Sequence, residues 1–112
     1  MQNTFSLEIE FRDPILLQLF EGVKVTNKNY RYTEELLNQF RKTIRKLQSG
    51  TNINELKSFK SLNYEKLKGN LKGKCSARIN KQYRLIFEEI INPLDKELVE
   101  ILAIEEISKH YE

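Results

Sequence analysis

Residues 75–104 read CSARINKQYRLIFEEIINPLDKELVEILAI and decide the fold. They contain three β-type runs, residues 75–80, 83–90 and 98–104, which are separated by Lys81-Gln82 and by residues 92–95. Short runs of apolar and β-branched residues between turn residues are typical of strands. The stretch therefore predicts three consecutive antiparallel strands. The first two form a hairpin, although Lys-Gln is not a preferred pair for a two-residue turn.

Upstream of these strands the apolar residues take helical spacing. Thr33 is a suitable N-cap, and two acidic residues follow it in the first turn, where the helix dipole favours them. A single apolar stripe comprises Leu36, Leu37, Phe40, Ile44 and Leu47, and Gly50 ends the helix. We also expect a half-buried strand over residues 5–11 and short helices over residues 15–20 and 52–62. The predicted class is α+β, a small antiparallel sheet with N-terminal helices packed on one face.

Composition limits the remaining possibilities. The 112 residues suit one domain, expected over residues 1–112, and the net charge of +3 is compatible with an anionic partner such as RNA. Cys75 and His110 are the sole cysteine and histidine, so neither an intrachain disulfide nor a zinc cluster is expected. No apolar run reaches the roughly 20 residues of a membrane span. We expect a soluble, cytoplasmic protein without a metal or another cofactor.

Residues 67–87, LKGNLKGKCSARINKQYRLIF, resemble the HigB branch of the RelE/ParE toxin superfamily. That branch shows Leu-Lys-Gly, a basic loop, a Ser-x-Arg-Ile-Asn strand and then Gln-Tyr-Arg with a nearby Phe. The matching residues are Ser76, Arg78, Ile79, Asn80, Gln82, Tyr83, Arg84 and Phe87. Three positions depart from the pattern: Cys75 replaces a Trp, Glu65 replaces a His, and residues 106–108 replace a closing Asp-Tyr-His.

The resemblance implies a twisted RelE-like sheet and the activity of a type II toxin–antitoxin toxin. Such a toxin is a metal-free, ribosome-dependent mRNA endoribonuclease that inhibits translation and arrests growth. Its implied partners are mRNA, the ribosome and a cognate antitoxin of the helix-turn-helix type. Two alternatives stay open: a ParE-like inhibitor of DNA gyrase, and a catalytically inactive binding module with the same fold.

Metal-free RNA cleavage needs a base for the ribose 2′-OH, a cation for the phosphate and an acid for the leaving oxygen. The resemblance places the catalytic arginine on the second hairpin strand, which makes Arg84 the first candidate to stabilise the transition state. Lys68 is the second candidate to bind the phosphate or to stabilise the negative charge that develops on it. The proton-transfer candidates are His110 and Tyr111, with Glu106 as a weaker one. The expected RNA-binding residues are Lys66, Lys72, Lys74, Arg78 and, by stacking on a base, Tyr64.

The expected hairpin register separates the two strand arginines. A two-residue turn at Lys81-Gln82 would place Ile79 opposite Arg84. Since side chains alternate between faces, Arg84 would then share a face with Cys75 and Ala77, and Arg78 would lie on the other face. Both arginines could reach one phosphate only if a bulge intervened.

Overall fold

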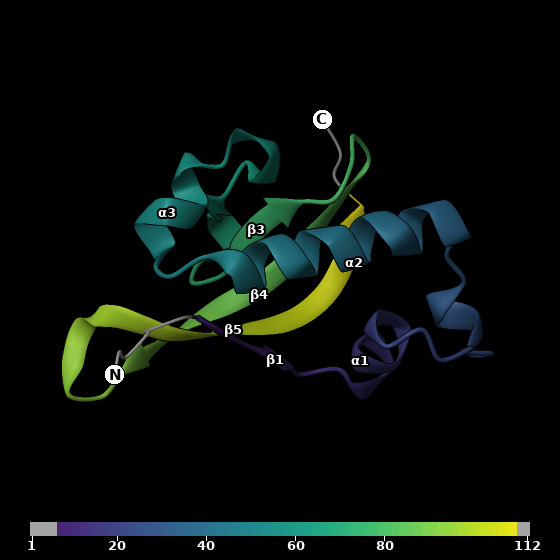
Figure 1. Cartoon of the computed structure of the whole chain (residues 1–112), viewed down its shortest axis with the longest axis horizontal. Coiled ribbons are helices and arrows are strands. Elements are labelled where there is room, and N and C mark those ends of the chain that lie inside the picture. Colours follow the sequence, from purple (N-terminus) through teal and green to yellow (C-terminus); the bar gives the residue numbers. More distant parts are fainter. Residues whose placement is uncertain (1–6, 110–112) are drawn as a thin grey trace.

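The computed structural model describes residues 7–109 and shows a five-stranded sheet with its main helices on one face (Figure 1). The elements are β1 (Glu8–Phe11), α1 (Pro14–Phe20), the 3-10 helix η1 (Lys28–Tyr30), α2 (Glu34–Ser49), α3 (Ile53–Ser58), the 3-10 helix η2 (Lys60–Leu62), β2 (Glu65–Lys66), the 3-10 helix η3 (Gly69–Leu71), β3 (Cys75–Arg78), β4 (Tyr83–Asn92) and β5 (Asp95–Lys109). The predicted α+β class and the order of strand, helices and three antiparallel strands are confirmed. The sequence did not reveal the two-residue strand β2.

The strand order across the sheet is β1-β5-β4-β3-β2. The pairs β2–β3, β3–β4 and β4–β5 are antiparallel, whereas β1 pairs with β5 in parallel and places Glu8 opposite Ile101. The sheet is therefore mixed, and the expectation of a wholly antiparallel sheet is corrected at this edge. No short turn joins β1 to β5, so local sequence does not set their relative direction.

Helix α2 covers the sheet with the predicted apolar stripe. The Thr33 hydroxyl accepts a hydrogen bond from the backbone N–H of Leu36 at 3.1 Å and caps the helix. All five stripe residues are buried, and they pack with Leu85, Phe87, Leu102 and Ile104 of the sheet. Gly50 ends the helix where the chain passes Leu56 so closely that an added Cβ would lie 2.4 Å from its Cδ2 atom. Within residues 7–109, no helix is long and apolar enough to cross a membrane.

The shorter helices differ slightly from the prediction. Helix α1 begins at Pro14, and the Asp13 carboxylate accepts a hydrogen bond from the backbone N–H of Ile15 at 2.9 Å. The single helix expected over residues 52–62 is interrupted at Phe59, whose extended backbone separates α3 from η2. The part of the predicted first strand before Leu7 lies outside the described residues.

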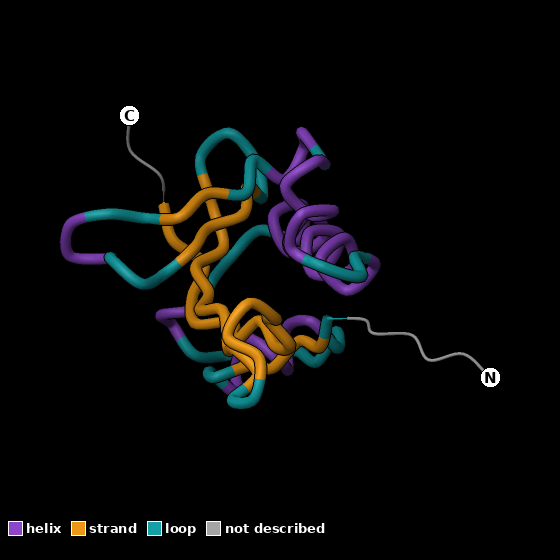
Figure 2. Tube along the Cα trace, turned by 90° about the vertical axis from the view of Figure 1, so that its left-hand side faces the viewer, coloured by secondary structure: helices purple, strands orange, loops and turns teal. Residues whose placement is uncertain are grey.

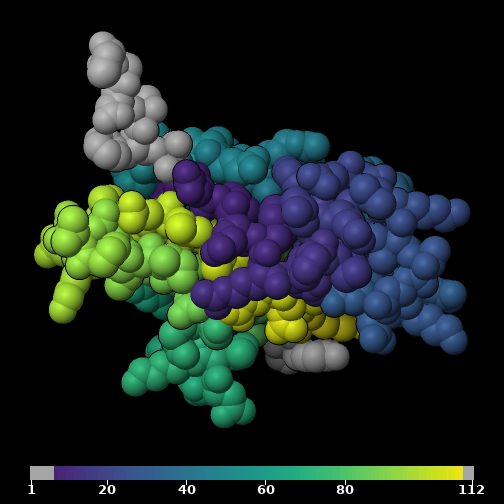
Figure 3. Space-filling view, turned by 90° about the horizontal axis from the view of Figure 1, so that it is seen from below, coloured from purple at the N-terminus to yellow at the C-terminus, as the bar shows by residue number. Residues whose placement is uncertain are grey.

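Among residues 7–109, no long helix packs along the opposite face of the sheet, which we call the open face (Figure 2). Figure 2 shows α2 and α3 on one side of the strands and the loop that carries η3 on the other. In the view from below, this loop protrudes as a green-teal lobe beyond the yellow strand β5 (Figure 3). Hydrogen bonds from Leu67 N to Lys74 O and from Lys74 N to Leu71 O close the loop at its base. The fold therefore places a basic lobe beside an open sheet surface.

Candidate functional site

The β3–β4 hairpin has a different register from the expected one. Arg78 lies directly opposite Arg84, and Ala77 lies opposite Leu85. The connection is a wider loop in which Ile79 N and Asn80 N both donate to the carbonyl oxygen of Tyr83. Directly opposite residues on neighbouring strands point to the same face. The expectation that Arg78 and Arg84 lie on opposite faces is therefore wrong.

The side chain of Asn80 sets this loop. Its Oδ1 atom accepts hydrogen bonds from the backbone N–H groups of Gln82 and Tyr83, each at 2.8 Å. A two-residue turn of the favoured type would need positive φ at both Lys81 and Gln82, and among residues 7–109 Asn63 is the only non-glycine residue with positive φ. The asparagine turn avoids that conformation, and the resulting one-residue shift in pairing brings both arginines to the same, open face of the sheet.

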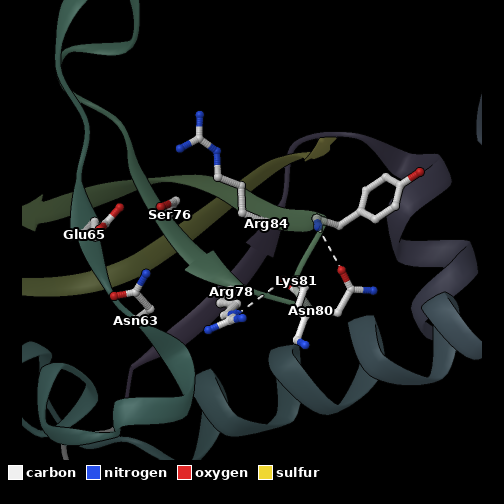
Figure 4. A pocket seen from close by; sticks show the side chains of 8 residues that line it. Asn63, Glu65, Ser76, Arg78, Asn80, Lys81 and Arg84 are labelled. Carbon is white, nitrogen blue, oxygen red and sulfur yellow. Dashed lines mark hydrogen bonds between the residues drawn. The ribbon is translucent and has the colours of Figure 1, made fainter. Parts of the chain in front are cut away.

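A pocket of about 120 Å³ opens at this end of the sheet (Figure 4). It is lined by Asn63, Glu65, Ser76, Arg78, Asn80, Lys81, Tyr83 and Arg84. These residues come from the segment before β2, from β2 itself and from both arms of the β3–β4 hairpin. Three of the eight side chains are cationic, and a fourth, Glu65, is acidic. The pocket therefore combines a basic site for an anion with a single carboxylate.

The two arginines of this pocket make no ion pair within the described part of the chain. Arg78 is exposed and donates from Nε to the carbonyl oxygen of Asn80 at 3.3 Å. Arg84 is half-buried, and its Nε atom is buried without a hydrogen-bond partner. Like charges placed directly opposite destabilise a sheet, and an unpaired buried donor adds to that cost. An anion bound in the pocket would reduce the repulsion between the two arginines and could accept a hydrogen bond from Arg84.

Glu65 is a site residue that the sequence reasoning missed. It pairs with Ser76 across β2 and β3, and both side chains face the pocket (Figure 4). Asn63, with a φ of 44°, turns the chain into β2. The available signal was the departure from the family pattern, since Glu65 stands where one subgroup has a histidine. A carboxylate can replace an imidazole as a proton acceptor.

The lysines of the basic loop fall into two groups. Lys68 and Lys72 are exposed in the protruding lobe and do not line the pocket. Lys74, at the base of the lobe, is half-buried and bonds from Nζ to the Glu105 carboxylate at 2.5 Å, with Glu88 at 3.9 Å. Lys74 therefore anchors the lobe to the sheet, and it would have to break these contacts to bind a phosphate.

Arg12 completes this network on the open face. Its Nη1 atom lies 2.5 Å from Glu88 Oε1 and 2.7 Å from Glu105 Oε2, so two cations share two carboxylates. The hydrogen bond from Arg12 lowers the pKa of the Glu88 carboxyl. Glu105 is the extra residue of a β-bulge, since Ile86 pairs with Glu106 whereas Phe87 pairs with Ile104. The bulge thus brings the Glu105 carboxylate to Lys74, which anchors the lobe to the sheet.

Tyr64 has a structural role that conflicts with base stacking. Its hydroxyl donates to Glu89 at 2.7 Å, and its ring packs edge-on against Phe87 with 5.4 Å between centroids. Burial, followed by the hydrogen bond to Glu89, raises the pKa of Tyr64. Lys66 is exposed, with its Nζ atom 3.9 Å from the same carboxylate. The prediction that Tyr64 stacks on a base is not supported, because its ring is already packed against the core.

Of the predicted proton-transfer residues, the structure describes only Glu106, which does not line the pocket. Glu106 pairs with Ile86 while Arg84 pairs with Ser108, so Glu106 is a diagonal neighbour of Arg84, and it lines a separate hollow beside Asp13 and Tyr32. His110 and Tyr111 lie outside the described residues. Their assignment as acid and base stays a prediction.

The remaining chemistry of the described chain is limited. Burial raises the pKa of the Cys75 thiol to about 12, and Cys75 lies in the core, as expected of a small apolar residue rather than a nucleophile. Across residues 7–109, no three acidic, cysteine or histidine side chains gather in a way that could hold a metal ion. The pocket is lined by two arginines, which suit an anion, and by one carboxylate.

Comparisons with known proteins agree with this fold. The family model of HigB-like toxins, described as the RelE-like toxin of type II toxin-antitoxin system HigB, matches residues 9–102. Toxin HigB-1 of Vibrio cholerae serotype O1 is 34% identical over 82 residues, which cover 73% of this chain and 83% of that protein.

Two solved structures share the fold. YafQ from E. coli has a TM-score of 0.52 at 14% identity, with 92% of each chain covered. The YoeB/ParE toxin from Agrobacterium tumefaciens has a TM-score of 0.51 at 16% identity, with 94% of this chain and 100% of that chain covered. This chain therefore belongs to the HigB-like family of RelE-like toxins of type II toxin–antitoxin systems.

Proposed function

We propose that this toxin is a metal-free, ribosome-dependent mRNA endoribonuclease that inhibits translation and arrests growth. The observation that carries the proposal is the pairing of Arg78 and Arg84 in one pocket, without ion pairs among the described residues and beside Glu65. Unneutralised guanidinium groups on adjacent strands suit the pentavalent phosphate of RNA cleavage, which gains negative charge in the transition state.

Three pocket residues have roles in this reaction. The ribose 2′-oxygen attacks the adjacent phosphorus and loses its proton, and the bond to the 5′-oxygen of the next nucleotide breaks as that oxygen gains a proton. Arg84 binds the phosphate and stabilises its growing charge, and Arg78 contributes from the opposite strand. Glu65 accepts the 2′-OH proton. His110, Tyr111 and Glu106 stay the candidates that protonate the leaving oxygen.

The basic lobe and the partners complete the proposal. Lys68 and Lys72 are exposed and without ion pairs in the described chain, which suits binding to phosphates that flank the cleaved one. The family description names a toxin–antitoxin system, which supports a cognate antitoxin as partner, and we propose that it is of the helix-turn-helix type. The ribosome, with its bound mRNA, would be the target in the cytoplasm.

Inducible expression in a bacterium tests this function. Growth and mRNA integrity are followed together for wild type, Arg84→Ala and the control Lys96→Ala, which removes one exposed charge from the start of β5. Wild type and control should arrest growth and cut mRNA, whereas Arg84→Ala should do neither.

Two outcomes would replace the proposal. Growth arrest with intact mRNA would reject the nuclease and favour a gyrase inhibitor. Soluble wild-type protein that changes neither growth nor mRNA would favour an inactive binding module.

A further inference from the structure

A second and larger hollow, of about 650 Å³, lies between α2 and the end of β3. We call it the α2 groove. It is lined by Gln39, Lys42, Thr43, Arg45, Lys46, Ser49, Ser61, Leu62, Arg78 and Ile79. Lys42, Lys46 and Ser49 follow one another at spacings of four and three residues and so share one face of the helix. The stripe that packs on the sheet occupies another face of α2, which leaves the groove side facing outward.

Cations dominate the charge of the α2 groove. Lys42, Arg45, Lys46 and Arg78 are all exposed, and none makes an ion pair within the described part of the chain. No aspartate or glutamate is among the lining residues. The groove is therefore a concentrated site of positive potential that no carboxylate of residues 7–109 neutralises through an ion pair.

Two of these cations are held in place by aromatic rings. Lys46 Nζ lies 4.1 Å from the centroid of the Phe59 ring, and the Arg45 guanidinium carbon lies 5.8 Å from that of Phe20. Such contacts order a long side chain without neutralising its charge. Less conformational entropy is then lost when an anion binds.

The α2 groove is continuous with the pocket on the open face, because Arg78 lines both. We propose that the groove binds the phosphate backbone of the single-stranded RNA segment next to the nucleotide held at Arg84. This proposal rests on the proposed function and adds a second RNA contact to it. From Lys42 to Ser49 the helix rises about 10 Å at 1.5 Å per residue, a length that suits roughly two nucleotides.

The lining favours RNA over a docked protein segment. A peptide that binds in a groove places apolar anchors in apolar pockets. Here the two apolar lining residues, Leu62 and Ile79, are only 2% and 9% exposed, so they offer little apolar surface. The exposed lining consists of lysines, arginines, serines and an amide, the side chains that contact phosphate and ribose.

Binding of RNA oligonucleotides of increasing length tests the inference. The probes are single strands of three and nine nucleotides, 2′-O-methylated throughout to prevent cleavage, and the readout is fluorescence anisotropy from low to high salt. The test variant is the double substitution Lys42→Gln and Lys46→Gln. The matched control, Lys24→Gln with Lys96→Gln, removes the same charge from exposed lysines outside the groove. Urea unfolding of both variants verifies that they remain folded.

The inference predicts a loss that depends on length. Loss of two phosphate contacts lowers the slope of log affinity against log salt by about 1.4, and affinity for the nine-nucleotide strand by roughly 10- to 30-fold at 0.1 M salt. Affinity for the three-nucleotide strand should change less than threefold, and the control should bind both strands as wild type does.

Other outcomes overturn the inference in distinguishable ways. Equal losses on both lengths, or an equal loss in the control, would mean that only general charge matters. If the test variant bound RNA normally but lost affinity for a polyglutamate peptide, the groove would be a protein-binding site. If the length effect appears but wild type does not cut mRNA in cells, RNA binding in the α2 groove is supported and the proposed ribonuclease activity is rejected. If wild type cuts mRNA in cells but the length effect is absent, the ribonuclease activity is supported and RNA binding in the α2 groove is rejected.

Discussion

Replacing Arg84 with methionine should change activity and stability in opposite directions. Loss of one preorganised donor to the transition state lowers the cleavage rate by about 10²- to 10³-fold. The folded protein loses no hydrogen bond or ion pair seen among residues 7–109, because the Arg84 Nε atom is buried without a partner. Removing an unpaired buried donor relieves about 1–3 kcal/mol, and removing the charge opposite Arg78 relieves about 0.2–1 kcal/mol. Since Arg84 is half-exposed, we expect a net gain near 1 kcal/mol in the free energy of unfolding.

The assay pairs urea unfolding with cleavage of ribosome-bound mRNA. Leu85→Ala is the matched control, because Leu85 is the next residue on β4, points to the core and is 0% exposed. It should lose about 2–5 kcal/mol of stability. The reasoning is refuted if Arg84→Met is destabilised by more than 1 kcal/mol, or if it retains more than a tenth of the wild-type cleavage rate.

Three further predictions concern carboxylates. Tyr64→Phe should lower the free energy of unfolding by about 1–2 kcal/mol in urea, since it removes a hydrogen bond to the partly buried Glu89; an unchanged stability would contradict this role. Glu65→Gln should slow cleavage by about 100-fold, because an amide accepts no proton; a rate within threefold of wild type would exclude Glu65 as the base. Arg12 lowers the pKa of Glu88, so the ionised carboxylate stabilises the fold above its ordinary pKa, and this contribution disappears as pH falls through the lowered value. Glu88→Gln should therefore flatten the acid side of the stability profile by about 0.5 kcal/mol, given the 37% exposure of Glu88, and a steeper acid side would contradict it.

Local sequence predicted the helical layer well. The stripe on α2 repeats with the helical period, and capping by Thr33 and termination near Gly50 depend on residues at those positions. These signals act within a few residues of one another, so one sequence is enough to read them. The interruption at Phe59 was less visible, because residues 52–62 contain no proline or glycine that would end a helix.

The hairpin register could not be read from strand patterns. Both arms contain apolar residues that fit either register, and the choice depends on the Asn80 side chain, which accepts two backbone hydrogen bonds in the loop. A shift by one residue moves every side chain of one strand to the other face relative to its partner strand. The sequence therefore identified Arg78 and Arg84 as candidates but placed them on opposite faces, and the pocket that they share became visible only in the structure.

Contacts between distant segments were also beyond the sequence. Lys74 was a reasonable phosphate ligand by composition, but its partner Glu105 is 31 residues away and reaches it through a β-bulge. Arg12 joins the same network from the other end of the chain. Glu65 entered the pocket through the two-residue strand β2, which is too short to leave a periodic signal.

The proposed mechanism depends on attack by the ribose 2′-OH within the arginine pocket. The most direct measurement uses purified wild-type toxin and ribosomes programmed with a message that carries one 2′-deoxynucleotide on the 5′ side of the mapped cleavage site. We predict that cleavage at that position disappears, while cleavage at other sites of the same message continues. Continued cleavage at the 2′-deoxy position would contradict the mechanism and the roles given to Arg84 and Glu65.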